Sequence, residues 1–187
     1  MPEPPVPRAG TVGRMGLLHE YAADVVWTGA GATGTTGYAA YSRDHEVRVA
    51  GKPVVLASAD PAFRGDPARH NPEELLVAAL AECHMLWFLH FAATSGVAVV
   101  GYADRAGGTM RVEAAGHGQF TQVVLRPQVT VRPGGAAAAD GAALDAQLAD
   151  LHRRAHEHCF IARSVTFPVL TEPAPAVLET AGAGSAG

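Results

Sequence analysis

Cysteine is scarce in this chain of 187 residues, which contains only Cys83 and Cys159. Two cysteines cannot form the disulfide framework that stabilises small secreted proteins, so that class is excluded. Basic residues are also few: 14 Lys and Arg are scattered among 18 Asp and Glu, with no basic run. Nucleic-acid-binding proteins cluster such residues on one face, so we expect no nucleic-acid partner.

Targeting and membrane signals are lacking as well. Residues 1–16 contain no apolar core of the length that a signal peptide needs. The longest apolar stretch, residues 75–93, is interrupted by Glu82, His84 and His90, whereas a membrane span needs about 20 largely uncharged apolar residues. We therefore expect a cytoplasmic protein without membrane association, in which this stretch is a buried helix.

The composition, 48% hydrophobic and 17% charged, is that of a globular protein with a sizeable core. Residues 1–16 are rich in Pro and Gly without periodicity, which predicts a disordered N-terminal arm. Residues 173–187 have a similar composition and predict a disordered C-terminal tail. A single domain is expected over residues 17–172.

Two groups of β-prone segments flank a helical region. The segments before it are residues 21–27, 37–42, 46–49 and 54–57, and those after it are residues 97–103, 110–114, 120–131 and 164–170. The order of strands, helix, strands, helix and strand has no regular βαβ alternation. It predicts an α+β fold.

The central helix has the clearest signals in the sequence. Asn71 is a suitable N-cap, Pro72 fits the first helical position, and Glu74 stands where a capping box needs it. The helix should run to about Thr94 and end at Gly96. Its apolar residues cover every face, which favours a central rather than a surface position.

A second helix is predicted by the apolar stripe of Leu144, Leu148 and Leu151, and it should end near residues 156–159. Cys159 follows it closely, beside the cationic Arg163. We expect these polar surroundings, which also include histidines, to favour a thiolate at Cys159.

Cys83 lies in the middle of the central helix, where a cysteine is most simply a small core residue. Two cysteines placed by two helices also permit a peroxide cycle. One thiolate attacks the O–O bond and becomes a sulfenic acid, with which the other thiol condenses to a disulfide. The attacking thiol needs a neighbouring cation, because a free thiol has a pKa near 8.5. Arg43 and Arg64 are candidates, and Glu73 could orient either one; otherwise Glu73 only compensates the helix dipole.

Three segments resemble the OsmC/Ohr family. NPEELLVAALAECHM, residues 71–85, resembles the family's central-helix signature, in which N-P-E precedes the reactive cysteine. HEHCFIARS, residues 156–164, resembles the region of the second cysteine, although Phe160 stands where relatives often have Pro. HEYAADVVWTG, residues 19–29, resembles the first strand. The similarity spans residues 18–172.

The resemblance implies an intertwined homodimer with antiparallel sheets wrapped around a long central helix. It implies a thiol-dependent peroxidase that reduces organic hydroperoxides without a cofactor or metal and is restored by a dithiol reductant such as a lipoyl group. Cys83 would be the peroxidatic thiol and Cys159 the resolving one. Glu73 matches the family's glutamate. Arg64 matches its arginine with a one-residue gap, and Arg43 is the competitor.

The spacing of Glu73 and Cys83 bears on the dimer. Ten residues correspond to about 15 Å along an α-helix, too far for the carboxylate to assist the thiol of its own chain directly. If both serve one site, two antiparallel copies of this helix must cross. Glu73 of one chain would then approach Cys83 of the other.

Other interpretations remain open. Gly29, Gly31 and Gly34 match a dinucleotide-binding fingerprint, but that motif requires a helix to follow, and strand- and turn-like residues follow here. Cys83 and His84 together with His158 and Cys159 could hold zinc, but neighbouring helical side chains diverge by about 100°. A Cys-His-Asp hydrolase has no supporting local motif. A non-catalytic OsmC-like protein that binds an apolar ligand or senses oxidants is the main alternative.

Overall fold

The computed structural model describes residues 18–180, and the predicted arm, residues 1–16, lies outside them. The described chain divides between Arg69 and His70 into two compact units, each of which is described by itself. Both helices and sheets are present, which confirms the α+β prediction. The single domain expected over residues 17–172 stays a prediction.

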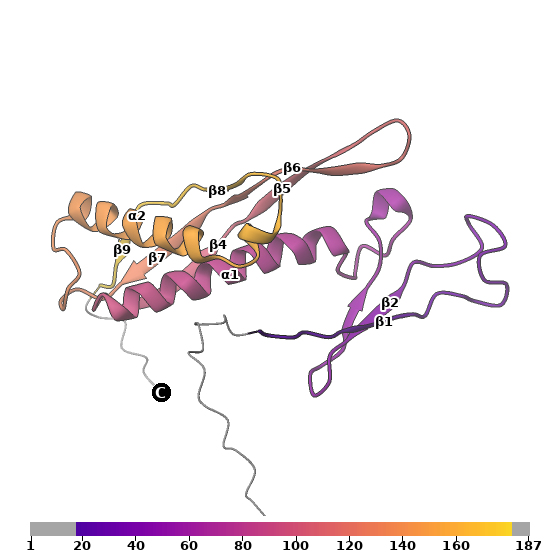
Figure 1. The fold of residues 1–187 in the computed structure, drawn as a ribbon, viewed down its shortest axis with the longest axis horizontal. Coiled ribbons are helices and arrows are strands. Elements are labelled where there is room, and N and C mark those ends of the chain that lie inside the picture. Colours follow the sequence, from indigo (N-terminus) through magenta and orange to yellow (C-terminus); the bar gives the residue numbers. More distant parts are fainter. Residues whose placement is uncertain (1–17, 181–187) are drawn as a thin grey trace, which may run out of the picture. The chain divides into compact units, whose positions relative to one another are not determined.

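The first unit contains one antiparallel sheet with the strand order β1-β2-β3. Strand β2 lies in the middle, with His45 opposite Trp27 on one side and Ala57 on the other. A short 3-10 helix, η1, follows the sheet (Figure 1). The bounds of these elements are β1 Asp24–Trp27, β2 His45–Arg48, β3 Val55–Ala57 and η1 Pro61–Phe63.

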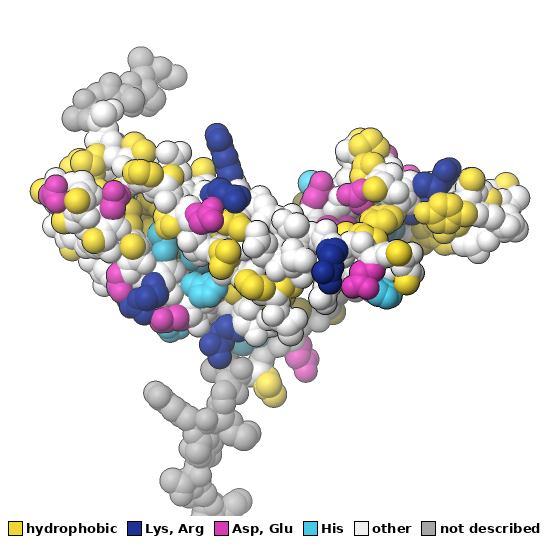
Figure 2. Space-filling model, turned by 90° about the horizontal axis from the view of Figure 1, so that it is seen from above, with side chains coloured by type: hydrophobic (Ala, Val, Ile, Leu, Met, Phe, Trp, Pro, Cys, Tyr) yellow, Lys and Arg dark blue, Asp and Glu magenta, His cyan; other side chains and the backbone are white. Residues whose placement is uncertain are grey.

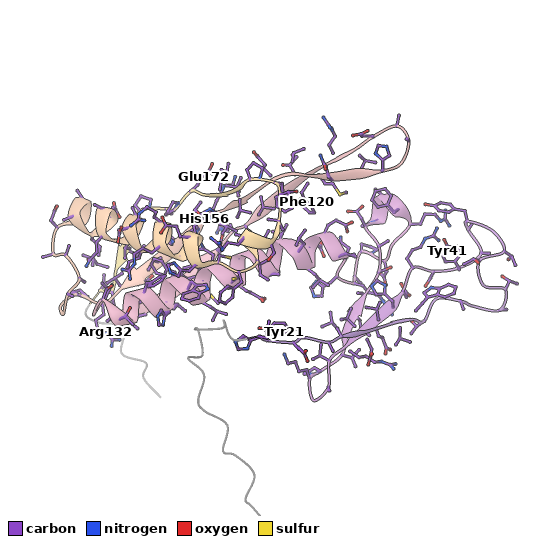
Figure 3. All side chains as sticks on the ribbon, in the orientation of Figure 1. Tyr21, Tyr41, Phe120, Arg132, His156 and Glu172 are labelled. Atoms are coloured by element: carbon purple, nitrogen blue, oxygen red, sulfur yellow. The ribbon has the colours of Figure 1, made fainter. Side chains whose placement is uncertain are left out.

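The strand expected at residues 37–42 is absent, and the chain makes turns and bends there instead. Arg43 supplies the physical reason, because its guanidinium donates hydrogen bonds to the carbonyls of Tyr38 and Tyr41. It also lies 4.4 and 4.2 Å from the centroids of these two rings. Tyr41 thus belongs to a loop closed around a cation (Figure 3). No helix follows the glycines of this segment, so the dinucleotide interpretation is wrong.

The second unit begins with α1, Pro72–Thr94, whose predicted start is confirmed. The Asn71 side chain accepts a hydrogen bond from the Glu74 backbone N–H, and the Glu74 carboxylate accepts one from the Asn71 N–H. The helix ends at Ser95, and Gly96 follows with a φ of 74°. Glycine adopts this left-handed conformation without steric cost, which explains the predicted stop.

Two further sheets have the strand orders β4-β7-β9 and β5-β6-β8. The strand expected over residues 120–131 is broken, because Pro127 has no N–H and the Arg126 N–H donates to the Asp104 carboxylate instead. The elements of this unit are β4 Val99–Asp104, β5 Gly107–Val112, β6 Gly118–Leu125, β7 Pro127–Val131, α2 Gly141–His158, η2 Ala162–Ser164, β8 Val169–Thr171 and β9 Val177–Leu178.

The C-terminal strands differ from the sequence expectations. The segment 164–170 forms strand only at its end, in β8, which pairs in parallel with β6. Residues 177–178, predicted to be disordered, form β9 in parallel with β7. An ion pair between Arg132 and Glu179 at 2.6 Å lies beside this pairing. Such a long-range partner leaves no local signal in a Pro- and Ala-rich segment.

Helix α2 packs along α1 (Figure 1). Buried residues from both helices and from β7 form one core, against which partly buried residues of β4 pack, and Leu80 joins β6 and β8 in a second. Of the described helices, α1 alone has the length and hydropathy of a membrane span, with a mean hydropathy of 1.6. Only one of its faces is buried within the chain: Leu86, on another face, is 62% exposed. The burial on all faces that the sequence predicted is therefore not reached within this unit.

We predict that Asn71→Ala lowers the free energy of unfolding by about 1 kcal/mol, because it removes the acceptor for the Glu74 N–H. Asn71→Ser is the matched control, since serine can form the same capping box. The measurement is urea unfolding followed by circular dichroism. Equal stability of the alanine and serine variants would show that the cap contributes little.

Candidate active site

The two cysteines come from the two packed helices. Cys83 lies in the middle of α1 and is partly exposed. Cys159 is the C-cap residue of α2 and is only 1% exposed. Its backbone N–H donates to the His156 carbonyl, and its sulfur accepts a hydrogen bond from the Ala162 N–H at 3.4 Å. The end of α2 therefore fixes the position of this sulfur.

The Cys83 side chain lies close enough to Cys159 to help raise the pKa of the Cys159 thiol. Burial, with a smaller contribution from Cys83, raises the pKa of Cys159 to about 11. The expectation of a thiolate at Cys159 is therefore wrong. The cationic residues near it in sequence do not offset its burial, because Arg163 is exposed to solvent.

Aromatic rings lie beside the thiol pair. Trp87 follows Cys83 by one helical turn and so lies on the same face of α1. Its ring meets that of Phe160, the neighbour of Cys159, edge to face with centroids 5.5 Å apart. Phe91 and His158 complete this aromatic cluster. Phe160 is 65% exposed, so part of the cluster faces solvent.

Behind the thiols lies a buried pair of histidines. The Nε2 atom of His84 and the Nδ1 atom of His152 are 2.9 Å apart, and the two rings are nearly parallel, with an interplanar angle of 7°. Phe88 stacks on His152 with ring centroids 4.2 Å apart. His84 is 0% and His152 3% exposed. Burial, reinforced by His156, lowers the pKa of His84 to about 4, and burial together with His84 lowers that of His152 to about 3.

The four side chains considered for zinc turn to different partners. His84 is bonded to His152, and His158 is hydrogen-bonded to the Arg154 carbonyl at 2.9 Å. Among residues 18–180, no three His, Cys, Asp or Glu side chains are placed to hold a metal ion.

Glu73 lies in the first turn of α1, ten positions before Cys83, as the sequence indicates. Its Oε2 atom is buried and has no hydrogen-bond partner among the described residues. A buried carboxylate oxygen without a donor is costly. Glu73 is therefore placed to receive a donor such as a guanidinium, beyond its interaction with the helix dipole.

The two candidate arginines belong to the first unit and differ in their surroundings. Arg43 is already bound by the carbonyls and rings of its loop. The Arg64 guanidinium makes no hydrogen bond or ion pair within the described part of the chain and lies 5.8 Å from the Tyr38 ring centroid. Arg64 is also the only described non-glycine residue with a positive φ, 68°. Such strained positions gather at functional sites.

The family model described as OsmC-like protein matches residues 65–173, more than half of the chain. The fold and the two-helix cysteine site agree with this match. The chain belongs to the OsmC-like family.

Solved structures show the same fold. An OsmC-like protein of unknown function from Vibrio cholerae is 38% identical with a TM-score of 0.72, over 84% of this chain and 100% of that one. An organic hydroperoxide resistance protein, OsmC, from Legionella pneumophila is 15% identical with a TM-score of 0.59, over 88% and 100%. An OsmC-like protein from Mycoplasma pneumoniae is 10% identical with a TM-score of 0.62, over 86% and 99%. No curated protein matches the chain.

Sequence reasoning missed the histidine pair, although a signal was present. His152 continues the stripe of Leu144 and Leu148 at intervals of four residues, so it stands at a core-facing position of α2. Likewise, His84 follows Leu80 by four residues on the buried face of α1. A histidine on each of two apolar faces indicates a buried polar contact if the two helices pack together.

We predict that the free energy of unfolding falls as the pH is lowered from 6.5 to about 4. Within this window the unfolded histidines bind protons that the folded, buried ones do not. Each of the two histidines steepens the pH dependence of the free energy of unfolding by up to ~1.4 kcal/mol per pH unit.

Urea unfolding at pH 7 and pH 5 measures this change, and the double variant His84→Leu/His152→Leu is the comparison. Carboxylates titrate equally in both proteins, so the difference in slope isolates the histidines. The same decline in both proteins would contradict the assignment of neutral, buried rings.

Proposed function

We propose that the protein reduces organic hydroperoxides by a two-cysteine cycle. The Cys83 thiolate attacks a peroxide oxygen, the O–O bond breaks, and the alkoxide takes up a proton and leaves as an alcohol. The Cys83 sulfenic acid condenses with the Cys159 thiol, which forms a disulfide and releases water. A dithiol reductant, for example a lipoyl group, then restores both thiols by exchange and becomes a disulfide itself.

The proximity of the two thiols, which come from two packed helices, carries this proposal. The only two cysteines of the sequence come from separate helices and meet, which a disulfide step requires. Their exposure supports distinct roles, because a peroxide can reach the partly exposed Cys83, whereas Cys159 is buried. The raised pKa of Cys159 suits a thiol that waits for the sulfenic acid rather than one that attacks the peroxide.

The aromatic cluster supports an organic peroxide as substrate. Trp87 and the exposed Phe160 offer apolar surface next to the thiols. An alkyl or aryl group of the substrate that packs on these rings would be removed from water, which favours binding. Hydrogen peroxide has no such group. The Legionella pneumophila relative named as an organic hydroperoxide resistance protein has the same fold.

A homodimer is part of the proposal. The exposed apolar residues of α1, such as Leu86, need a partner surface. The first unit also exposes Val25, Leu56 and Phe63, and Figure 2 shows hydrophobic side chains at its surface. A second copy would cover these faces and would bring Glu73 of one chain towards Cys83 of the other, as their spacing along α1 requires.

Arg64 is the proposed activating cation. Apart from its contact with the Tyr38 ring, its guanidinium makes no hydrogen bond or ion pair with the described residues, and the buried Oε2 of Glu73 lacks a donor. A guanidinium held by this carboxylate would favour the thiolate of Cys83. Because the cycle needs reduced thiols between turnovers, the cytoplasm is the proposed compartment.

We predict steady-state consumption of cumene hydroperoxide in the presence of a dithiol. Cys83→Ser reduces turnover to background, because the attacking sulfur is lost. In the absence of the dithiol, Cys159→Ser still consumes one equivalent of peroxide and accumulates a sulfenic acid at Cys83, which a 1,3-diketone traps. Oxidation of the wild type once without turnover would identify a sensor instead, and no oxidation at all would overturn the proposal.

The position of Glu73 in the dimer is tested by complementation. Glu73→Gln and Cys83→Ser chains carrying different affinity tags are co-expressed, and the mixed dimer is purified through both tags. One of its two sites combines an intact Cys83 with the partner's intact Glu73, so about half of the wild-type turnover is expected, against little for either parent. No recovery in the mixed dimer would place Glu73 outside the partner's site, and failure to isolate a mixed dimer would refute the dimer.

A further inference from the structure

We propose that His84 and His152 are positioning residues, whose hydrogen bond sets the register of α1 against α2 and thereby holds the Cys83 and Cys159 thiols together. This inference rests on the proposed two-cysteine function for its consequence, but its geometry stands on the described contacts alone.

The two histidines are tied closely to the two cysteines along the chain. His84 directly follows Cys83 on α1. His152 precedes Cys159 by seven residues, or two turns of α2, and therefore lies on nearly the same side of that helix. A contact between the imidazoles fixes one point of each helix within two turns of its sulfur. Any sliding or rotation of α1 on α2 would therefore displace the two imidazoles from each other and the two sulfur atoms from each other at the same time.

The rest of the interface between the helices is less directional. Around the histidines the packing is made by aliphatic and aromatic side chains such as Phe88, Leu148 and Leu151. Hydrophobic contacts are not directional and tolerate small shifts in register. A hydrogen bond of 2.9 Å between two rigid, nearly parallel rings tolerates few such shifts. Arg154 of α2 makes only a long, partly buried hydrogen bond of 3.5 Å to Ser95 at the end of α1. The imidazole pair is therefore the buried polar contact that selects one register.

Burial keeps the pair in its hydrogen-bonded form. Both imidazoles are shielded from water, and Phe88 covers the His152 ring. The pKa values lowered to about 4 and about 3 mean that both rings are neutral at physiological pH. One ring then donates and the other accepts, and breaking this bond would leave two buried polar atoms unpaired.

The consequence concerns the disulfide step. Condensation of the Cys83 sulfenic acid with Cys159 depends on how often the two sulfur atoms are in contact. A displacement of about 1 Å can reduce such a reaction about a hundredfold. The histidine pair therefore acts on formation of the disulfide, after the peroxide has been reduced, and not on the first attack.

The test uses the full chain and needs no peroxidase activity. The double variant His84→Leu/His152→Leu removes the hydrogen bond without leaving an unpaired polar group, so it should fold. The pair His84→Gln and His152→Asn is the conservative control, because the amides mimic the ring nitrogens that form the bond. The equilibrium between the dithiol and the Cys83–Cys159 disulfide is measured in buffers of reduced and oxidised dithiothreitol.

We expect the double leucine variant to unfold at a temperature near that of the wild type while its disulfide equilibrium constant falls at least about tenfold. The Gln/Asn variant should recover most of this loss. A folded double leucine variant with an unchanged equilibrium constant would overturn the positioning role. If that variant does not fold, the Gln/Asn variant decides: a constant near the wild-type value supports the role, and one as low as that of His84→Leu alone refutes it.

The outcome is independent of the proposed function. If the wild type forms the disulfide in dithiothreitol buffers but consumes no peroxide, the positioning role stands and the peroxidase proposal falls. If peroxide is turned over but the dithiol–disulfide equilibrium does not depend on the histidines, the peroxidase proposal stands and the positioning role falls.

Discussion

The packing of α1 on α2 is the contact on which the candidate site depends. Each helix contributes one cysteine, and neither sulfur would meet the other without this interface. The interface has an apolar part, made by residues such as Phe88 and Leu148, and a polar part, the buried pair His84–His152. Burial favours association of the helices, and the histidine pair selects one arrangement. The proposed disulfide step therefore depends on how α1 and α2 pack.

Local signals in the sequence predicted local structure well. The start of α1 follows from Asn71, Pro72 and Glu74, whose capping interactions involve only neighbouring residues. The strand break at Pro127 and the parallel pairing of β9 depend on partners distant in the chain, and the sequence did not reveal them. The loop at residues 37–42 is shaped by Arg43, a cation whose role as the centre of a loop no periodicity indicates.

The site was predicted in part. The family resemblance identified both cysteines, and the structure brings them together, although the sequence surroundings of Cys159 were misleading. Cys159 has histidines and an arginine as its neighbours in the sequence. In the folded protein its burial dominates and raises its pKa. The assignment of Arg64, which is favoured over Arg43 because its guanidinium makes no hydrogen bond or ion pair with the described residues, and that of Glu73 stay predictions.

The central claim is that Cys83 and Cys159 of one chain form a functional pair. Peptide mapping by mass spectrometry after one equivalent of cumene hydroperoxide, with alkylation of the remaining thiols, tests it most directly. The account predicts one disulfide that joins the peptides containing Cys83 and Cys159 within a chain that still migrates as a monomer under denaturing, non-reducing conditions. Full alkylation of both cysteines after oxidation, or a disulfide that links two chains, would contradict it.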